Sequence, residues 1–225
     1  MNVLVFASRK GGTGKSTLAA HLAAFAHKPS RPCLLIDEDP QGSLDLWNTL
    51  RGVNALPFKT VKRSISDVLK TAKRNDVEWV FIDTPPSMSV SVTDAIQNAT
   101  LLVIPCRPGV FDINAIQETI EFARRVRTPY AVVINGAPPK RGDAQSPLVT
   151  AVRESLSRLD VPVWGGQITQ RASYALALGE GEGASEFDAA SHSADEIARL
   201  WLAIEKSVRA INAARGGSGM HRVAA

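Results

Sequence analysis

The residues that could do chemistry begin at position 8, in the stretch SRKGGTGKST. Glycines placed this closely let a backbone curl so that successive N–H groups face one anion. We expect Lys15 to reach the β and γ phosphates of a nucleotide, Ser16 to bind Mg²⁺ and Thr17 to bond the α phosphate. The residues expected to surround the phosphates are Gly11, Gly12, Thr13, Gly14, Lys15, Ser16 and Thr17.

The loop departs from the usual phosphate-binding pattern at its start. The pattern G-x-x-x-x-G-K-[ST] would place a glycine at position 9, where this chain has Arg9. A second lysine, Lys10, follows immediately. A helix that starts near Lys15 would add its positive N-terminal end to the anion site. The loop therefore keeps its chemistry and gains a cation with no obvious role of its own.

Carboxylates follow two apolar runs farther along the chain. Asp37 and Asp39 lie in LLIDEDPQGS at 34–43, and Asp83 ends the apolar part of VFIDTPPS at 80–87. A carboxylate at the end of a buried strand, opposite a phosphate loop, can hold the Mg²⁺ shell or orient an attacking water. A single aspartate of this kind could equally be a turn former or helix cap. Two such sites after one glycine loop favour a nucleotide site.

These residues must be positioned by alternating strands and helices. Apolar, strand-like runs occupy 3–7, 32–37, 57–61, 77–86, 99–106, 130–136 and 161–169. Helical periodicity occupies 15–27, 43–50, 64–75, 113–126, 147–159 and 193–213. The alternation predicts an α/β fold, a mostly parallel, doubly wound sheet flanked by helices. Nucleotides bind such sheets at the carboxyl ends of the strands, where the glycine loop and the aspartates described above are found. We expect one domain at 1–213 and a disordered tail at 214–225.

Composition fits an ordinary globular domain. The 225 residues are 44% hydrophobic and 21% charged, with a formal net charge of +4. No apolar run approaches the roughly 20 residues of a membrane span, and no signal peptide is evident, so we expect a cytoplasmic protein. Cys33 and Cys106 both fall in predicted strands, which favours reduced, buried thiols. The basic charge permits nucleic-acid binding without requiring it.

The segment KGGTGKST, with its leading lysine, resembles the deviant Walker A motif of the ParA/MinD class of P-loop ATPases. The resemblance implies a P-loop NTPase fold with ATP and Mg²⁺ as cofactors. It also implies that Lys10 crosses a dimer interface to the partner's phosphates, so that two ATP molecules lie between two subunits. A triphosphate buried at an interface carries more charge than one lysine and one Mg²⁺ cancel, which gives a second cation a physical purpose.

The resemblance extends to the other candidate residues. LLIDEDPQ is similar to the family's D-x-D-P-Q segment, which implies that Asp39 positions the hydrolytic water and that Asp37 lies nearer the metal's water shell. Asp83 matches the Walker B aspartate, which holds Mg²⁺ through water. Asn135 falls where the family often reads the adenine edge, although an asparagine before Gly136 is equally typical of a turn.

Within the class, the chain most resembles small ParA proteins that lack an N-terminal DNA-reading domain. Residues 168–187 resemble the matching region of ParF-like plasmid-partition proteins. This implies an ATP-bound homodimer that binds DNA non-specifically, associates with the nucleoid and hydrolyses ATP slowly until a separate adapter protein stimulates it. The cargo would be a plasmid, a chromosome or a large protein assembly.

The predicted DNA contacts are basic residues near the C-terminus. Arg171 matches a family position linked to DNA binding. Arg199, Lys206 and Arg209 lie within about 80° of one another on the expected helix 193–213. Its apolar positions, Ile197, Leu200, Trp201, Ile204, Val208 and Ile211, should pack on the body. Clustered Lys and Arg would meet DNA phosphates.

Three other types of protein in the superfamily match the sequence less well. The membrane-bound MinD type needs a C-terminal amphipathic helix, but the end GGSGMHRVAA has only Met220 and Val223 as apolar bulk, so we expect no membrane partner. An electron carrier of the nitrogenase iron-protein type would need cysteines at the nucleotide edge, and Cys33 starts its strand at the opposite end. A P-loop enzyme that activates a small metabolite would need a polar substrate pocket, which the sequence does not reveal. The last two remain alternatives.

Overall fold

A seven-stranded sheet forms the centre of the molecule. The computed structural model describes residues 1–60, 64–140, 142 and 144–220, the last four by backbone only. Its sheet has the order β3-β2-β4-β1-β5-β6-β7, and every neighbouring pair is parallel. The strands are β1 Asn2–Phe6, β2 Cys33–Asp37, β3 Phe58–Thr60, β4 Trp79–Asp83, β5 Leu101–Cys106, β6 Tyr130–Ala137 and β7 Ile168–Thr169. The predicted fold class is confirmed.

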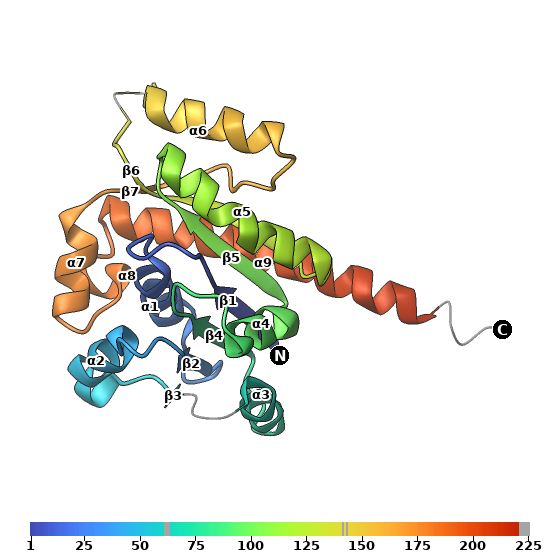
Figure 1. The fold of residues 1–225 in the computed structure, drawn as a ribbon. Coiled ribbons are helices and arrows are strands. Elements are labelled where there is room, and N and C mark those ends of the chain that lie inside the picture. Colours follow the sequence, from blue (N-terminus) through green and yellow to red (C-terminus); the bar gives the residue numbers. More distant parts are fainter. Residues whose placement is uncertain (61–63, 141, 143, 221–225) are drawn as a thin grey trace.

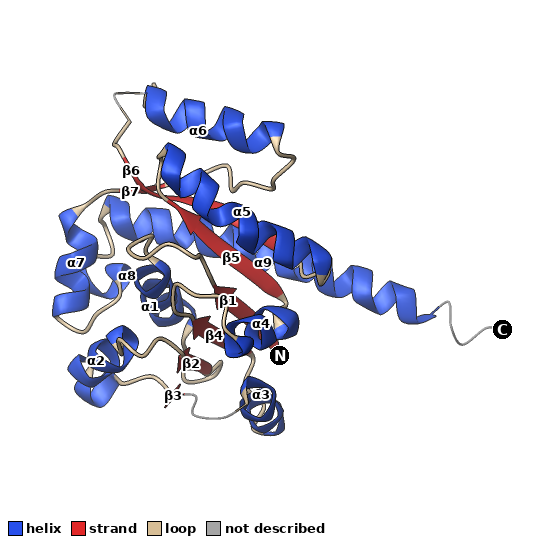
Figure 2. Ribbon diagram, in the orientation of Figure 1, coloured by secondary structure: helices blue, strands red, loops and turns tan. Residues whose placement is uncertain are grey.

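Helices cover both faces of the sheet (Figure 1; Figure 2). They are α1 Lys15–Ala26, α2 Ser43–Leu50, α3 Ile65–Arg74, α4 Val90–Asn98, α5 Val110–Arg125, α6 Pro147–Arg158, α7 Ala172–Gly179, α8 Ala184–Phe187 and α9 His192–Met220, with a short 3₁₀ turn at Gly52–Asn54. Side chains of α3, α4, α5 and α6 share one apolar core, and those of α1, α2, α7, α8 and α9 share the other. The layers are therefore helix, sheet and helix.

The alternation of side chains along the strands builds these two cores. In β1, Val3 and Val5 belong to the core under α3–α6, whereas Leu4 and Phe6 belong to the core under α1 and α9. Because successive strand residues point to opposite faces, an uninterrupted apolar run fills both cores at once. The runs seen in the sequence are thus the expected signature of a sheet buried on both sides.

The long C-terminal helix α9 packs as its apolar spacing predicted. Five of its six predicted apolar positions are buried and the sixth is partly buried; they are Ile197, Leu200, Trp201, Ile204, Val208 and Ile211. Trp201 meets Trp79 of β4 edge-on, with 4.6 Å between ring centroids. The helix continues to Met220, past residue 213, where the sequence analysis ended the domain. Of the predicted disordered tail, residues 214–220 are helical, and residues 221–225 lie outside the described residues.

Several local boundaries differ from the sequence-based expectation. The strand predicted at 77–86 ends at Asp83, because the two prolines at 85 and 86 lack the N–H that a strand ladder needs. The strand predicted at 161–169 is reduced to Ile168–Thr169. Position 61 of the predicted 57–61 strand lies outside the described residues. Helices α4, α7 and α8 were not predicted. No helix within the described ranges is long and apolar enough to cross a membrane.

Candidate nucleotide-binding site

The glycine loop joins the carboxyl end of β1 to α1 and is fixed by a residue from a distant strand. Gly12 and Gly14 have positive φ angles of 72° and 96°, which side chains rarely allow. Asn135 of β6 is buried, and its amide nitrogen donates to the Thr13 carbonyl oxygen at 2.6 Å. A Cβ atom at Gly14 would collide with that same amide. The loop conformation and the position of Asn135 therefore depend on each other.

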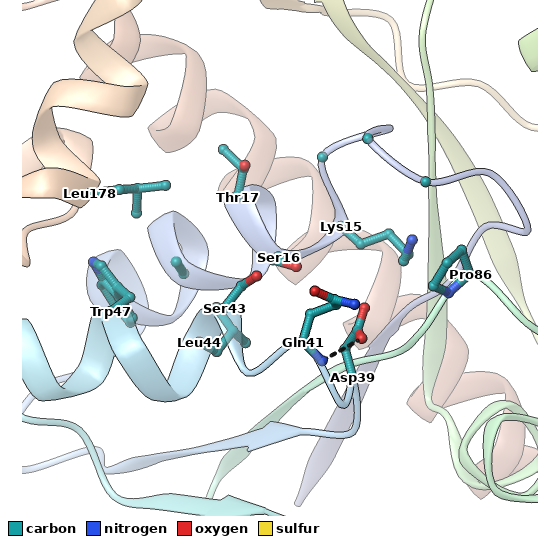
Figure 3. Close-up of a pocket in the computed structure, with 14 residues that line it drawn as sticks. Lys15, Ser16, Thr17, Asp39, Gln41, Ser43, Leu44, Trp47, Pro86 and Leu178 are labelled. Carbon is teal, nitrogen blue, oxygen red and sulfur yellow. Dashed lines mark hydrogen bonds between the residues drawn. The ribbon is translucent and has the colours of Figure 1, made fainter.

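A cavity of about 530 Å³ opens beside this loop (Figure 3). Lys15 extends along it toward Pro86, and Asp39, which follows β2, lies below the end of the Lys15 side chain in this view. Burial lowers the pKa of Lys15, while the nearby Asp83 and Asp39 carboxylates oppose that shift. The residues that line the cavity are Gly11, Gly12, Gly14, Lys15, Ser16, Thr17, Ala20, Asp39, Gln41, Ser43, Leu44, Trp47, Pro86 and Leu178. Six of the seven residues predicted to surround the phosphates thus line one cavity together with the predicted catalytic carboxylate, whereas Thr13 is buried and does not line it.

Asp83 supplies the strongest indication of a cation site. It is 0% exposed, and its Oδ2 accepts a hydrogen bond from the Ser16 hydroxyl at 2.5 Å. Its Oδ1 is also buried and has no hydrogen-bond partner among the described residues. Burial raises the pKa of this carboxyl to about 7, more than the Ser16 hydrogen bond lowers it. A hydroxyl beside an unpartnered buried carboxylate oxygen fits the oxygen-rich, partly hydrated shell of Mg²⁺.

Asp37 stands beside Asp83 in the sheet register and has a structural task as well. Its carboxylate accepts the backbone N–H groups of Asp39 at 3.0 Å, Leu44 at 3.0 Å and Asp45 at 3.3 Å. These bonds cap the start of α2 and fix the turn that carries Asp39. The location is compatible with the predicted place near the water shell of a metal ion, whereas the capping role was not predicted.

Lys10 is held by an acidic residue of the same chain. Its ammonium lies 2.8 Å from Asp112 Oδ2, at the first turn of α5, and its carbonyl oxygen accepts a 3.4 Å bond from the Lys15 ammonium. The Lys10 side chain remains 40% exposed, whereas that of Asp112 is mostly buried. Sequence reasoning missed Asp112, because residue 112 is 102 positions away and only the fold brings it near the loop.

A second, smaller hollow of about 170 Å³ shares Gly14, Thr17 and Leu178 with the phosphate cavity. Asn135 lines it, together with Arg107 and Gln170 from neighbouring strand ends. Amide side chains of this kind can pair with the edge of a purine base. The location is compatible with the base-reading role predicted for Asn135, and it adds Arg107 and Gln170, which the sequence analysis did not select.

The predicted DNA contacts do not form one free cationic cluster. Arg171 precedes α7 and pairs with Glu196 at 3.2 Å. On α9, Arg199 pairs with Asp195 at 2.9 Å, and Arg209 lies 3.9 Å from Glu205. Lys206 is exposed on the same helix. Three of the four, Arg199, Lys206 and Arg209, therefore lie on α9. Arg171, Arg199 and Arg209 each have an acidic neighbour that was not predicted.

The two cysteines lie at opposite ends of the parallel strands. Cys33 is the first residue of β2 and Cys106 is the last residue of β5. Both are buried free thiols, and burial raises the pKa of each to about 12. The prediction of separate, buried thiols is confirmed.

Comparisons with known proteins show the family of this chain. Residues 4–184 match the CobQ/CobB/MinD/ParA nucleotide-binding domain family. The chain belongs to this family. It is 30% identical to the maintenance of carboxysome distribution protein A of Halothiobacillus neapolitanus, over 88% of this chain and 93% of that protein. It is 33% identical to the protein ParA of Rhizobium radiobacter, over 77% and 81% of the two chains.

Solved structures of the ParA/MinD class share the fold. A complex of a Cyanothece McdA variant with ATP superposes with a TM-score of 0.65 and covers 96% of each chain at 19% identity. At that identity the similarity shows the fold alone. It confirms the P-loop NTPase architecture that the glycine loop predicted.

The raised pKa of Asp83 predicts a pH-dependent stability without Mg²⁺. The folded state disfavours the Asp83 carboxylate, so stability is lost as pH rises from the unfolded pKa near 4 toward about 7. Asp83→Asn should therefore raise the melting temperature at pH 8 and raise it less at pH 5, as measured by calorimetry in EDTA. Glu121→Gln, on the exposed side of α5, is the control. An equal effect of Asp83→Asn at both pH values would contradict this prediction.

Proposed function

We propose that this protein is a ParA-type ATPase that forms an ATP-bound homodimer, binds DNA non-specifically and positions a cargo through partner-stimulated hydrolysis. The observation that carries the proposal is that the two lysines of the glycine loop differ in their surroundings. Lys15 lines the phosphate cavity, whereas Lys10 does not line it and is paired with Asp112 while still 40% exposed. One lysine can serve the nucleotide of its own subunit and the other that of a partner.

The nucleotide would bind with its phosphates against the loop and the N-terminal end of α1. Gly11, Gly12 and Gly14 expose backbone N–H groups there, and Lys15 adds a buried cation. Ser16 and Asp83 would hold Mg²⁺, with Asp37 near its water shell, and the ion would neutralise charge on the β and γ phosphates. Gly14 and Thr17 line both the phosphate cavity and the smaller hollow, and Asn135 lines the smaller hollow, which would receive the base.

Hydrolysis needs a group that orients water in line with the γ phosphate. Asp39 is suited to this, because its backbone turn is fixed by Asp37 and its Oδ1 accepts the Gln41 N–H at 3.0 Å. The carboxylate lies below the end of the Lys15 side chain in Figure 3. A residue at the cavity mouth, on a loop, is accessible to an adapter protein that completes the site, which would make unassisted hydrolysis slow.

The relatives support the proposed biological role. One relative maintains carboxysome distribution, and others are partition proteins, among them the chromosome-partitioning ATPase Soj of Treponema pallidum. We therefore propose a cargo of plasmid, chromosome or large assembly, moved by a protein associated with the nucleoid. The electron-carrier alternative loses support, because Cys33 lies at the edge opposite the phosphate loop. No described feature favours the metabolite-activating enzyme.

The two lysines should separate nucleotide binding from dimerisation. Lys15→Ala removes a buried cation from the phosphate cavity and should weaken ATP binding by about 100-fold or more. Lys10→Ala should leave ATP affinity within about threefold and abolish dimers, because its contribution is made to the partner. Fluorescent-nucleotide titration and light scattering with ATP and Mg²⁺ measure the two effects. Wild-type protein that remains monomeric with ATP would count against the proposed function.

Asp39 should be needed for hydrolysis and dispensable for assembly. Asp39→Ala is expected to lower phosphate release by about 100-fold and to accumulate ATP-bound dimers. The matched control is Asp45→Ala, because Asp45 is exposed on α2 and its part in the Asp37 cap uses only backbone. Turnover by Asp39→Ala at the wild-type rate would remove the role assigned to this carboxylate.

DNA binding should require ATP and depend on Arg171. In gel shifts with random duplex DNA, wild-type protein should bind with ATP and not with ADP. Arg171→Ala should weaken binding for all sequences and reduce the salt slope by about 1 for each phosphate that Arg171 neutralises. Lys70→Ala, whose ammonium pairs with Asp67 on α3, is the control. Unchanged affinity and salt slope for Arg171→Ala would exclude this residue from the DNA surface.

A further inference from the structure

Two large apolar side chains protrude side by side from the first turn of α5. Val110 is 77% exposed and Phe111 is 82% exposed. The helix is preceded by Gly109, which provides no side-chain cap. Single exposed apolar residues are common, but two adjacent ones, including an aromatic ring, present a larger surface from which water would be released on contact. Nothing in the described part of this chain covers them.

Ion pairs on both sides fix this apolar pair next to the nucleotide loop. Asp112, the next residue, holds Lys10 at 2.8 Å. Glu118, two turns farther along α5, pairs with Arg9 of the same loop. Phe111 and Glu118 are seven residues apart, so they lie on the same side of the helix. We define the α5 shoulder as Arg9, Lys10, Val110, Phe111, Asp112 and Glu118.

The charges of the α5 shoulder indicate which kind of partner fits it. It carries two cations and two anions, Arg9 and Lys10 with Asp112 and Glu118, so that its net charge is zero. Such a surface gives no net attraction to DNA or to a partner segment of one charge sign. A two-fold interface places the same patch on both subunits, so a patch with both charge signs around an apolar centre can complement itself.

We propose that Val110 and Phe111 are the apolar anchors of the interface between two copies of this chain. The inference rests on the proposed ATP-dependent dimer and says which side chains give one copy its affinity for the other. Lys10 belongs to the same shoulder and would make association depend on the nucleotide. The apolar pair would supply nucleotide-independent contact area beside it. Removing the aromatic ring should therefore weaken the dimer without affecting how one subunit binds ATP, since neither anchor lines the phosphate cavity.

The test compares Phe111→Ser and Val110→Ser with wild-type protein. Leu202→Ser is the matched control, because Leu202 is 63% exposed on α9, outside the shoulder. Sedimentation with a non-hydrolysable ATP analogue and Mg²⁺ gives the dimer dissociation constant, and fluorescent-nucleotide titration gives the affinity of each subunit. Phe111→Ser should raise the dimer dissociation constant by about tenfold or more, with unchanged nucleotide affinity and melting temperature. Leu202→Ser should change none of these quantities.

The outcomes separate this inference from the proposed function. If wild-type protein dimerises and both shoulder variants dimerise equally tightly, the α5 shoulder is not the interface, whereas the ATP-dependent dimer stands. If wild-type protein stays monomeric with the analogue, the proposed dimer itself fails and the shoulder loses its assigned partner. If Phe111→Ser lowers the melting temperature, Val110→Ser decides the matter by the same measurements.

Discussion

The site is organised around one buried carboxylate that lacks enough neutralising partners. Asp83 sits at the end of a fully buried strand, and one of its oxygens meets no donor among the described residues. Burying an unpaired charge is costly, so the folded protein without a cation favours a proton there. A metal ion carried in with a nucleotide would relieve that cost. Binding of a metal ion would thus be coupled to the protonation of Asp83 in the central sheet.

The parallel sheet makes this arrangement possible because all its strands end at one edge. Asp37 and Asp83 are register partners on adjacent strands, and β1 delivers the glycine loop to the same edge. Short loops after these strands then need little conformational freedom to place Lys15, Ser16 and Asp39 around one cavity. The caps and hydrogen bonds in these loops, such as the three N–H groups on Asp37, hold the acceptors in place before any ligand arrives.

Local chemistry was readable from the sequence, and long-range pairing was not. Consecutive glycines, a lysine and two hydroxyls define a phosphate loop by their own spacing, and Asp83 follows a run apolar enough to be recognised as a buried strand. Asp112 and Glu196, which hold Lys10 and Arg171, are ordinary acidic residues on helices. Only the packing of α5 and α9 against distant segments brings them to these cations. Of the helices that were missed, α8 has only four residues, and α4 contains the β-branched residues Val90, Val92, Thr93 and Ile96, which have low helix propensity.

The burial of Cys33 and Cys106 makes the chain convenient for spectroscopy. With each pKa raised to about 12, almost no thiolate forms at neutral pH, and neither sulfur is accessible to a bulky reagent. A cysteine introduced on the surface would therefore react alone with a maleimide dye or spin label. A variant with one added surface cysteine, and with Cys33 and Cys106 left in place, could then report separations across an assembly as nucleotide is added and consumed.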